Sequence, residues 1–431
     1  MSTTDPQRAA APPLAPDSTG LTGWYRDLGV KERRTLKACF GGWALDAMDV
    51  QLYSFVIPTL IALWGIDRAQ AGLLGTAALV TSALGGWLAG WLADRWGRVR
   101  TLQITILWFA GFTFLSGLAQ SFEQLFIARV LMGFGFGGEW AAGAVLLGET
   151  IRAEHRGKAL GTMQSGWAVG WGAAAILYTL AFTLLPPETA WRVLFFIGLA
   201  PAALVFFLRR FIEEPEVYRE SQARIAETGD RPAFLEIFQG PLLRTTLLGA
   251  LMGTGAQGGY YAITTWLPTF LRTERGLSVI NTGGYLAVLI VSAFLGYMGG
   301  AYLSDRIGRR NTFLFFALGS CAVVLVYTMV PFGNAAMLVL GAPLGFFSAG
   351  VFSAMGAFFT EQFPTRVRGV GQGFAYNFGR ATGALFPWLV GALSASMPLG
   401  TAIGAFAAAA YLTMAVAAYM LPETRGKVLT A

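Results

Sequence analysis

Gly90-Trp91-Leu92-Ala93-Asp94-Arg95-Trp96-Gly97-Arg98 is the stretch that decides the fold, because most of it occurs twice in the chain. The second copy, Leu303-Ser304-Asp305-Arg306-Ile307-Gly308-Arg309, begins 211 positions after Leu92. Each copy lies between two long apolar segments, as a short charged turn between helices would. A repeated turn at this separation in a chain of 431 residues indicates a duplicated protein.

Two further pairs of segments repeat at nearly the same separation. The segment Ser54–Thr59 (Ser-Phe-Val-Ile-Pro-Thr) corresponds to Thr264–Thr269 (Thr-Thr-Trp-Leu-Pro-Thr) at an offset of 210. At an offset of 212, a second set matches, namely Glu149, Arg156, Gly157 and Gly161 with Glu361, Arg368, Gly369 and Gly373. Parallel repeats of six membrane spans with a site between them are a transporter architecture.

The composition is that of a membrane protein. Hydrophobic residues make up 55% of the chain and charged residues 13%, about half the charge of an average soluble domain. Apolar residues fall in long blocks, and Leu399–Leu421 is long enough to cross a bilayer alone. A spanning helix needs about 20 mostly apolar residues, because its backbone polar groups must be satisfied within the helix.

We therefore predict an all-α membrane protein of twelve transmembrane helices in two pseudo-symmetric six-helix bundles. Predicted spans lie near 38–64, 71–93, 101–121, 124–149, 157–185, 191–210, 243–271, 280–303, 311–331, 335–360, 369–396 and 399–421. The bundles occupy 38–210 and 243–421, with cytoplasmic segments at 1–37, 211–242 and 422–431. Met1–Leu36 has no apolar core typical of a cleavable signal peptide, so it is predicted to be a disordered tail.

Orientation follows from the basic residues. With the N-terminus inside, cytoplasmic segments hold 25 of the 31 Lys and Arg, and external loops hold Arg68, Arg192, Arg272 and Arg275. Positive charge stays on the cytoplasmic side, so both termini are predicted to be cytoplasmic in a multi-pass protein of the inner (cell) membrane. The net charge of +7 then reflects topology in the lipid bilayer and requires no nucleic-acid partner.

Catalytic and metal chemistry is not expected. Cys39 and Cys321 lie far apart in apolar spans, and the single histidine, His155, lies in a charged loop. No disulfide framework or metal-ligand spacing is present, and no cofactor is predicted. The 211–242 linker is too short for a catalytic domain, so the chain is not expected to be an enzyme.

The repeated motifs resemble those of the major facilitator superfamily. The stretch 90–98 is similar to that superfamily's signature loop between its second and third helices, although Ala301 replaces a glycine in the second copy. Arg129–Gly135 resembles its fourth-helix motif, and Pro422–Gly426 its common ending. The resemblance covers nearly the whole chain and implies a secondary transporter, monomeric by family default.

Two motifs narrow the resemblance. Leu45–Asp49 in the first helix and Asn377–Gly383 in the eleventh look like the aromatic-acid and sialate proton symporters. Gly137–Trp140 in the fourth helix favours the sialate–monocarboxylate side. This resemblance implies uptake of an organic anion together with protons.

Five charged residues are predicted at bilayer depth, where each costs at least ~2.5 kcal/mol and is a functional candidate. They are Asp46, Asp49, Arg129, Glu139 and Arg380. Asp46 and Asp49 share one helix face, and burial beside a like charge favours proton binding by a carboxyl group. These two, with Glu139 and Arg129, are the predicted proton-coupling residues. Glu139 has an alternative as a structural partner of Arg129.

Arg380 is the predicted substrate-binding cation. Its planar fork suits a carboxylate, which it can hold by two parallel hydrogen bonds. The alternative is a fixed salt bridge to an acid in the other half. Weaker predicted substrate contacts are Asn377, Tyr260, Tyr261, Gln257, Tyr53, Gln164 and Trp167.

The repeated turns are predicted to serve gating. Gly86-x-x-x-Gly90 and Gly157-x-x-x-Gly161 allow close helix approach. The charged residues around them are expected to form two mirrored cytoplasmic clusters that break on inward opening. These residues are Asp94, Arg98, Glu149, Arg156, Asp305, Arg309, Glu361 and Arg368.

Three functions compete: proton-coupled import of a carboxylate, proton-driven export of drugs or metabolites, and a non-transporting receptor or enzyme. Exporters of the superfamily usually carry a Gly-Pro pair in the fifth helix, which Gly166–Gly172 lacks. Import is therefore favoured. Aromatic acids, small hydroxy or keto acids and sialic acid all fit Arg380, and the sequence leaves both the substrate and the choice between H⁺ and Na⁺ open.

Overall fold

The computed structural model describes residues 23–152, 155–214, 219, 223, 234–363 and 368–424, and these ranges contain helices and no strand. The first half comprises α1 (Gly23–Asp27), α2 (Val30–Trp64), α3 (Arg68–Trp96), α4 (Arg98–Gly117), α5 (Phe122–Thr150), α6 (Arg156–Leu184), α7 (Pro187–Ile197) and α8 (Ala202–Phe211). The second comprises η3 (Phe234–Phe238), α10 (Gly240–Thr273), α11 (Val279–Ile307), α12 (Arg309–Met329), α13 (Asn334–Gly350), α14 (Met355–Gln362), α15 (Arg368–Gly383), α16 (Leu385–Leu393) and α17 (Leu399–Met420).

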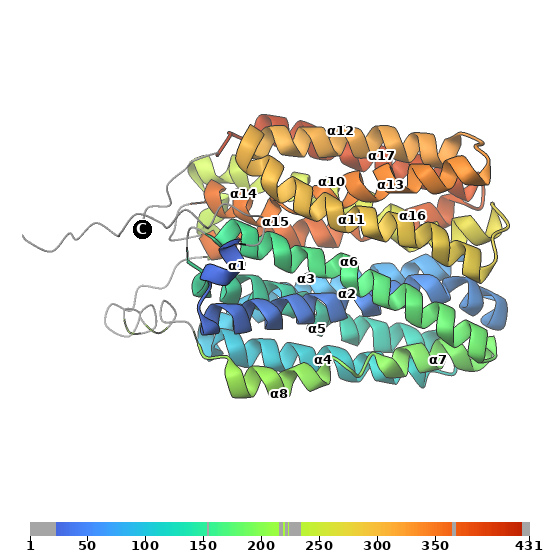
Figure 1. Cartoon of the computed structure of the whole chain (residues 1–431), viewed down its shortest axis with the longest axis horizontal. Helices are drawn as coiled ribbons and strands as arrows, with labels where there is room; N and C mark the ends of the chain where they lie inside the picture. The colour runs from blue at the N-terminus through green and yellow to red at the C-terminus, as the bar shows by residue number, and fades with distance from the viewer. Residues whose placement is uncertain are drawn as a thin grey trace, which may run out of the picture.

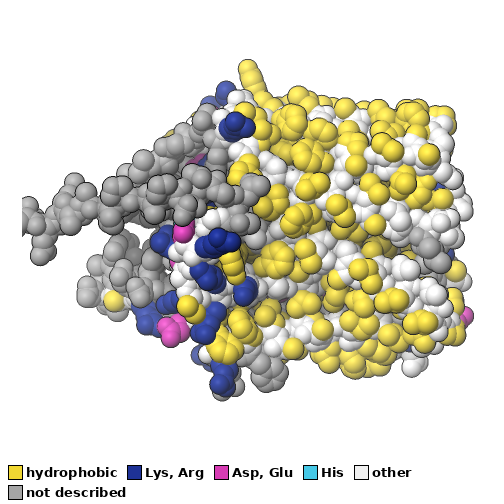
Figure 2. All heavy atoms as spheres, in the orientation of Figure 1, with side chains coloured by type: hydrophobic (Ala, Val, Ile, Leu, Met, Phe, Trp, Pro, Cys, Tyr) yellow, Lys and Arg dark blue, Asp and Glu magenta, His cyan; other side chains and the backbone are white. Residues whose placement is uncertain are grey.

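The long helices lie side by side, with α2–α8 on one side of the molecule and α10–α17 on the other (Figure 1). Hydrophobic side chains cover the flank seen in Figure 2, while Lys and Arg gather at one end. We call this the basic end; α2, α4 and α12 begin there. Within the described residues, ten helical segments are long and apolar enough to span a membrane. The predicted seventh and eleventh spans, α10 and α15–α16, complete the twelve.

Three predicted spans are not single helices. The sixth is divided into α7 and α8, the tenth into α13 and α14, and the eleventh into α15 and α16. Pro201 directly precedes α8, and Pro387 is the third residue of α16. Proline cannot donate the backbone hydrogen bond that continues a helix. Between α13 and α14 the backbone tightens instead, with Ser353 N donating to Gly350 O at 3.3 Å.

The repeated turn has the same construction in both halves. Gly97 (φ 105°) and Gly308 (φ 92°) lie between consecutive helices in a conformation that favours glycine. Behind each glycine a carboxylate accepts two backbone N–H groups of the next helix: Glu214 from Arg98 and Val99 (2.8 and 2.9 Å), and Glu423 from Arg309 and Arg310 (2.8 and 3.0 Å). These caps are a further element of the repeat, which the sequence analysis did not identify.

The Glu214 cap gives a stability prediction. Glu214→Ala removes the acceptor for two N–H groups at the start of α4, which costs about 1 kcal/mol and lowers the Tm by about 2 °C. Glu213→Ala is the matched control, because Glu213 is exposed and only pairs with Lys31 at 3.7 Å. Thermal unfolding of the purified variants in detergent measures the Tm shift of each variant. Equal shifts in the two variants would contradict the capping role.

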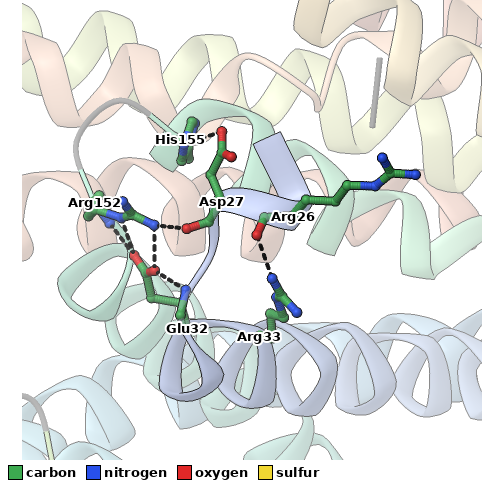
Figure 3. Close-up of polar contacts among 7 residues, drawn as sticks. Arg26, Asp27, Glu32, Arg33, Arg152 and His155 are labelled. Atoms are coloured by element: carbon green, nitrogen blue, oxygen red, sulfur yellow. Dashed lines mark hydrogen bonds and ion pairs between the residues drawn. The ribbon is translucent and has the colours of Figure 1, made fainter. Parts of the chain in front are cut away.

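The N-terminal segment packs against the loop between α5 and α6 (Figure 3). The Arg152 guanidinium donates to both Glu32 oxygens at 3.2 Å and to the Asp27 carbonyl. His155 Nε2 lies 3.8 Å from Asp27 Oδ2, and His155 is buried. These contacts hold α1 against the α5–α6 loop at the basic end of the first half.

This packing corrects the expected disorder of Met1–Leu36. Residues 23–27 form α1, and α2 begins at Val30, before the predicted start at 38. Residues 1–22 lie outside the described residues. In the predicted linker, η3 is helical and α10 begins at Gly240.

Candidate functional site

The first charged pair in the middle of the bundle joins α2 to α5. Arg129 Nη1 lies 3.2 Å from Asp49 Oδ2, and both side chains are fully buried. The guanidinium also lies over the Tyr53 ring, 4.8 Å from its centroid. Arg129 therefore pairs with Asp49 and not with Glu139, and this pair balances its own charge.

The second acidic residue of α2 faces a different partner. Asp46 is fully buried, and neither of its carboxylate oxygens accepts a hydrogen bond from a donor among the described residues. The Glu139 carboxyl group of α5, also buried, lies within hydrogen-bonding reach of it. Gly42, one turn before Asp46, leaves room for Glu139, because a Cβ atom there would overlap the carboxylate. Two buried carboxyl groups in contact cannot both ionise cheaply, so this pair is suited to hold a proton.

The Arg380 guanidinium comes from the opposite half. It is 1% exposed and makes two long hydrogen bonds, from Nε to Gln257 Oε1 (3.4 Å) and from Nη2 to the Tyr376 hydroxyl (3.5 Å). Its Nη1 has no hydrogen-bond partner among the described residues. The guanidinium lies over the Phe136 ring, with Cζ 5.0 Å from the ring centroid. Among the described residues no carboxylate lies within 4.0 Å of Arg380. The alternative of a fixed salt bridge is therefore not observed.

Aromatic side chains from both halves fill the space around these charges. Trp140 of α5 stacks on Tyr376 of α15 with ring centroids 3.7 Å apart and planes 9° apart. Trp167 Nε1 of α6 donates to the Tyr260 hydroxyl of α10 at 2.5 Å. The ring centroids of Trp43 and Trp167 are 4.8 Å apart. The centre is thus a largely aromatic enclosure with one guanidinium that has no direct carboxylate partner among the described residues.

Trp140 and Tyr376 were not among the predicted substrate contacts. Tyr376 lies one turn before Arg380, so helical spacing places it on the same face. Trp140 directly follows Glu139. Both signals were present in the sequence, but the stacking of the two rings depends on how α5 and α15 meet.

The predicted substrate contacts divide into those near Arg380 and those near other groups. Gln257 and Tyr261 lie beside Arg380, with the Tyr261 hydroxyl donating to Gln257 Oε1 at 3.3 Å. Tyr260 and Trp167 form the pair described above, and Gln164 accepts from Trp140 Nε1 at 3.3 Å. Asn377 packs against Gly86 of α3, and Tyr53 lies with Arg129. The structure thus brings all of them to the contact between the halves, with Tyr53 on the side of Arg129, where it lines a cavity together with Phe136 and Tyr261.

The two halves touch on both sides of this enclosure. Toward the basic end, Trp87 of α3 stacks on Phe374 of α15, with ring centroids 5.9 Å apart. Toward the opposite end, Arg272 Nη1 of α10 donates to the Tyr178 hydroxyl of α6 at 3.1 Å, and Gly391 of α16 packs against the Arg68 backbone. The central charges are therefore enclosed from both directions.

The predicted gating clusters are present in part. Arg98 pairs with Glu149 at 3.3 Å, and Arg309 pairs with Glu361 at 3.2 Å. The mirrored pairs lie at the basic end, one in each half. The side chains of the other four predicted members lie outside the described residues; these are Asp94, Arg156, Asp305 and Arg368.

A buried ionisable cluster enclosed between two helical halves defines a membrane carrier. The sequence pattern of the Major Facilitator Superfamily matches residues 39–387 and 292–430. The chain belongs to this superfamily, which confirms the predicted twelve-helix fold. Transport, and not enzymatic catalysis, is its class of activity.

A solved structure and two named relatives are consistent with this family. The chain resembles the solved structure of the proton:xylose symporter XylE bound to 6-bromo-6-deoxy-D-glucose, with a TM-score of 0.72 and 17% identity over 93% of this chain and 98% of that one. It is 42% identical to a probable 4-methylmuconolactone transporter of Cupriavidus pinatubonensis, covering 94% of each chain. It is 31% identical to the cis,cis-muconate transport protein of Acinetobacter baylyi, over 88% of this chain and 92% of the relative.

Proposed function

We propose that this protein imports an organic carboxylate together with protons by alternating access. The observation that carries the proposal is Arg380, a buried guanidinium at the contact between the halves with no carboxylate of the described residues within ion-pair distance. Burying a cation without a directly paired anion costs several kcal/mol. A substrate carboxylate offsets that cost by forming two charge-assisted hydrogen bonds with the guanidinium.

The cargo is a planar, conjugated or aromatic carboxylate. The rings of Phe136, Trp140 and Tyr376 lie around Arg380, and flat rings favour contact with a flat ligand. The relatives named for muconate and methylmuconolactone support an unsaturated organic acid as cargo.

Charge balance links the anion to protons. The middle of the bundle holds three buried carboxyl groups (Asp46, Asp49, Glu139) and two buried guanidinium groups (Arg129, Arg380). One proton shared by Asp46 and Glu139 makes this set neutral. A bound monocarboxylate adds one negative charge, and a second proton on the same pair restores neutrality. Anion binding and proton binding therefore favour each other.

The enclosure corresponds to an occluded step of the transport cycle. In our proposal the bundles 38–210 and 243–421 rock about the central site, with the basic end and both termini on the cytoplasmic side of the inner membrane. Opening toward the cytoplasm separates Trp87 from Phe374, which join the two halves. The Arg98–Glu149 and Arg309–Glu361 pairs each lie within one half and brace the basic end of that half. One chain supplies the whole site, so the functional unit is a monomer.

Uptake into proteoliposomes tests the proposal. Radiolabelled benzoate, muconate, lactate and sialate are offered with an inward proton gradient, an inward Na⁺ gradient or no gradient. The proposal expects one of the planar carboxylates to accumulate only with the proton gradient. Accumulation driven by Na⁺ would refute proton coupling. Proton-driven efflux of cationic or neutral compounds, with no carboxylate uptake, would favour the exporter.

A further inference from the structure

A small cavity lies beside the central enclosure, between α2, α3, α5 and α10. Its volume leaves space for about one or two water molecules. Hydrogen-bonding side chains line part of its wall; these are Gln51, Tyr53, Ser54, Arg129, Tyr261, Thr264 and Thr265. The larger part of the wall is apolar, so the cavity is a mostly apolar space with a few hydrogen-bonding groups.

Two side chains of this wall carry a donor that has no acceptor among the described residues. Gln51 is 1% exposed, and its amide nitrogen donates no hydrogen bond; Nε of Arg129, which is 2% exposed, also has no acceptor. Leaving one buried donor unpaired costs about 1–3 kcal/mol. A side chain that served packing alone would be apolar here. The unpaired donors therefore await an oxygen acceptor, which water or a ligand group can supply.

The cavity shares two side chains with the surroundings of Arg380. Phe136 lines the cavity, and the Arg380 guanidinium lies on its ring at 5.0 Å. Tyr261 also lines the cavity, and its hydroxyl shares the acceptor Gln257 Oε1 with Arg380 Nε. These shared side chains place the cavity next to Arg380.

We propose that the substrate is bifunctional: one carboxylate binds Arg380, and a second acceptor group at the far end of the molecule enters this cavity and binds Gln51. The second group is a carbonyl or carboxylate oxygen, because the groups awaiting it are donors. This inference rests on the proposed function, since it assumes that Arg380 holds the first carboxylate. It distinguishes acids with oxygen acceptors at both ends from simple monocarboxylates of the same size.

A matched pair of ligands tests the inference. trans,trans-Muconate and sorbate share a six-carbon diene with a carboxylate at one end, and they differ at the other end, which is a carboxylate in muconate and a methyl group in sorbate. Isothermal titration of the purified full chain in detergent gives a Kd for each, independently of transport. We expect wild type to bind muconate at least about tenfold more tightly than sorbate, as one hydrogen bond to a charged group predicts.

Gln51→Leu and Gln51→Glu are expected to reduce the muconate-to-sorbate affinity ratio about tenfold. The leucine variant removes the donor, and the glutamate variant keeps the size while replacing the donor with an oxygen. Gln362→Leu is the control, because Gln362 is also buried but donates to the Pro422 carbonyl at 3.0 Å, far from the cavity. This control should leave the ratio unchanged.

The outcomes separate the inference from the proposed function. If both ligands bind and Arg380→Gln abolishes both, but the ratio is near one or insensitive to Gln51, the second subsite is refuted and carboxylate recognition stands. If neither ligand binds, the subsite and the carboxylate proposal both fail. A ratio that falls in the two Gln51 variants and not in Gln362→Leu supports the subsite.

Discussion

Replacing Arg380 with lysine is expected to weaken carboxylate binding by about 100-fold, although the positive charge remains. The guanidinium can hold a carboxylate with two parallel hydrogen bonds, whereas an ammonium group is a point charge on a flexible stem. Lysine also loses the flat contact of Arg380 with the Phe136 ring at 5.0 Å. Arg380→Gln, which removes the charge, is expected to abolish binding. Isothermal titration of the purified variants measures both effects.

Arg192→Lys is the matched control for this substitution. Arg192 donates to the carbonyls of Gly117 and Ala119 at the C-terminal end of α4, away from the central enclosure. Its replacement should leave substrate affinity unchanged. Wild-type affinity in Arg380→Lys would show that the fork geometry is not used, and wild-type affinity in Arg380→Gln would remove Arg380 from the site.

Asp46→Asn is expected to separate transport from proton coupling. Asparagine matches aspartate in size but cannot take up or release a proton, so a pH gradient no longer drives accumulation. Concentrative uptake should fall at least about tenfold, while exchange of labelled for unlabelled substrate across the membrane continues. Glu139→Gln should behave alike, because Asp46 and Glu139 share one buried contact. Uptake and exchange are measured in the same proteoliposomes.

Asp49→Asn should give a different defect. It leaves Arg129 buried without its 3.2 Å partner, which costs about 3–5 kcal/mol, so the variant is expected to lose thermal stability or fail to accumulate in the membrane. Asp46→Asn removes no such partner. Full gradient-driven uptake in Asp46→Asn, or a stable Asp49→Asn that has lost coupling alone, would contradict this assignment.

The sequence was sufficient for the fold and for the list of buried charges. Apolar blocks of the right length located the spans, and the repeated turn at Gly97 and Gly308 identified the duplication. Charges inside those spans singled out the candidates, because each is costly in a bilayer. The helix breaks before Pro201 and Pro387 were missed, although proline chemistry accounts for them.

The pairing of the charges could not be predicted. Asp46 and Asp49 lie on one face of α2, and helical spacing alone suggests that they act together. In the structure Asp49 faces Arg129 and Asp46 faces Glu139, because α5 crosses α2 with Arg129 and Glu139 at different heights. That register is set by packing between helices, and no local pattern in either helix encodes it. The same holds for the stack of Trp140 on Tyr376.

The most direct test of the central claim is proton movement driven by substrate. Purified protein is reconstituted into liposomes that contain a pH-sensitive dye and have no initial pH gradient, and an inward gradient of a planar carboxylate that wild type binds is then imposed. The account predicts acidification of the lumen with wild type, and none with Asp46→Asn or Arg380→Gln. Substrate entry at the wild-type rate without acidification would contradict proton-coupled import.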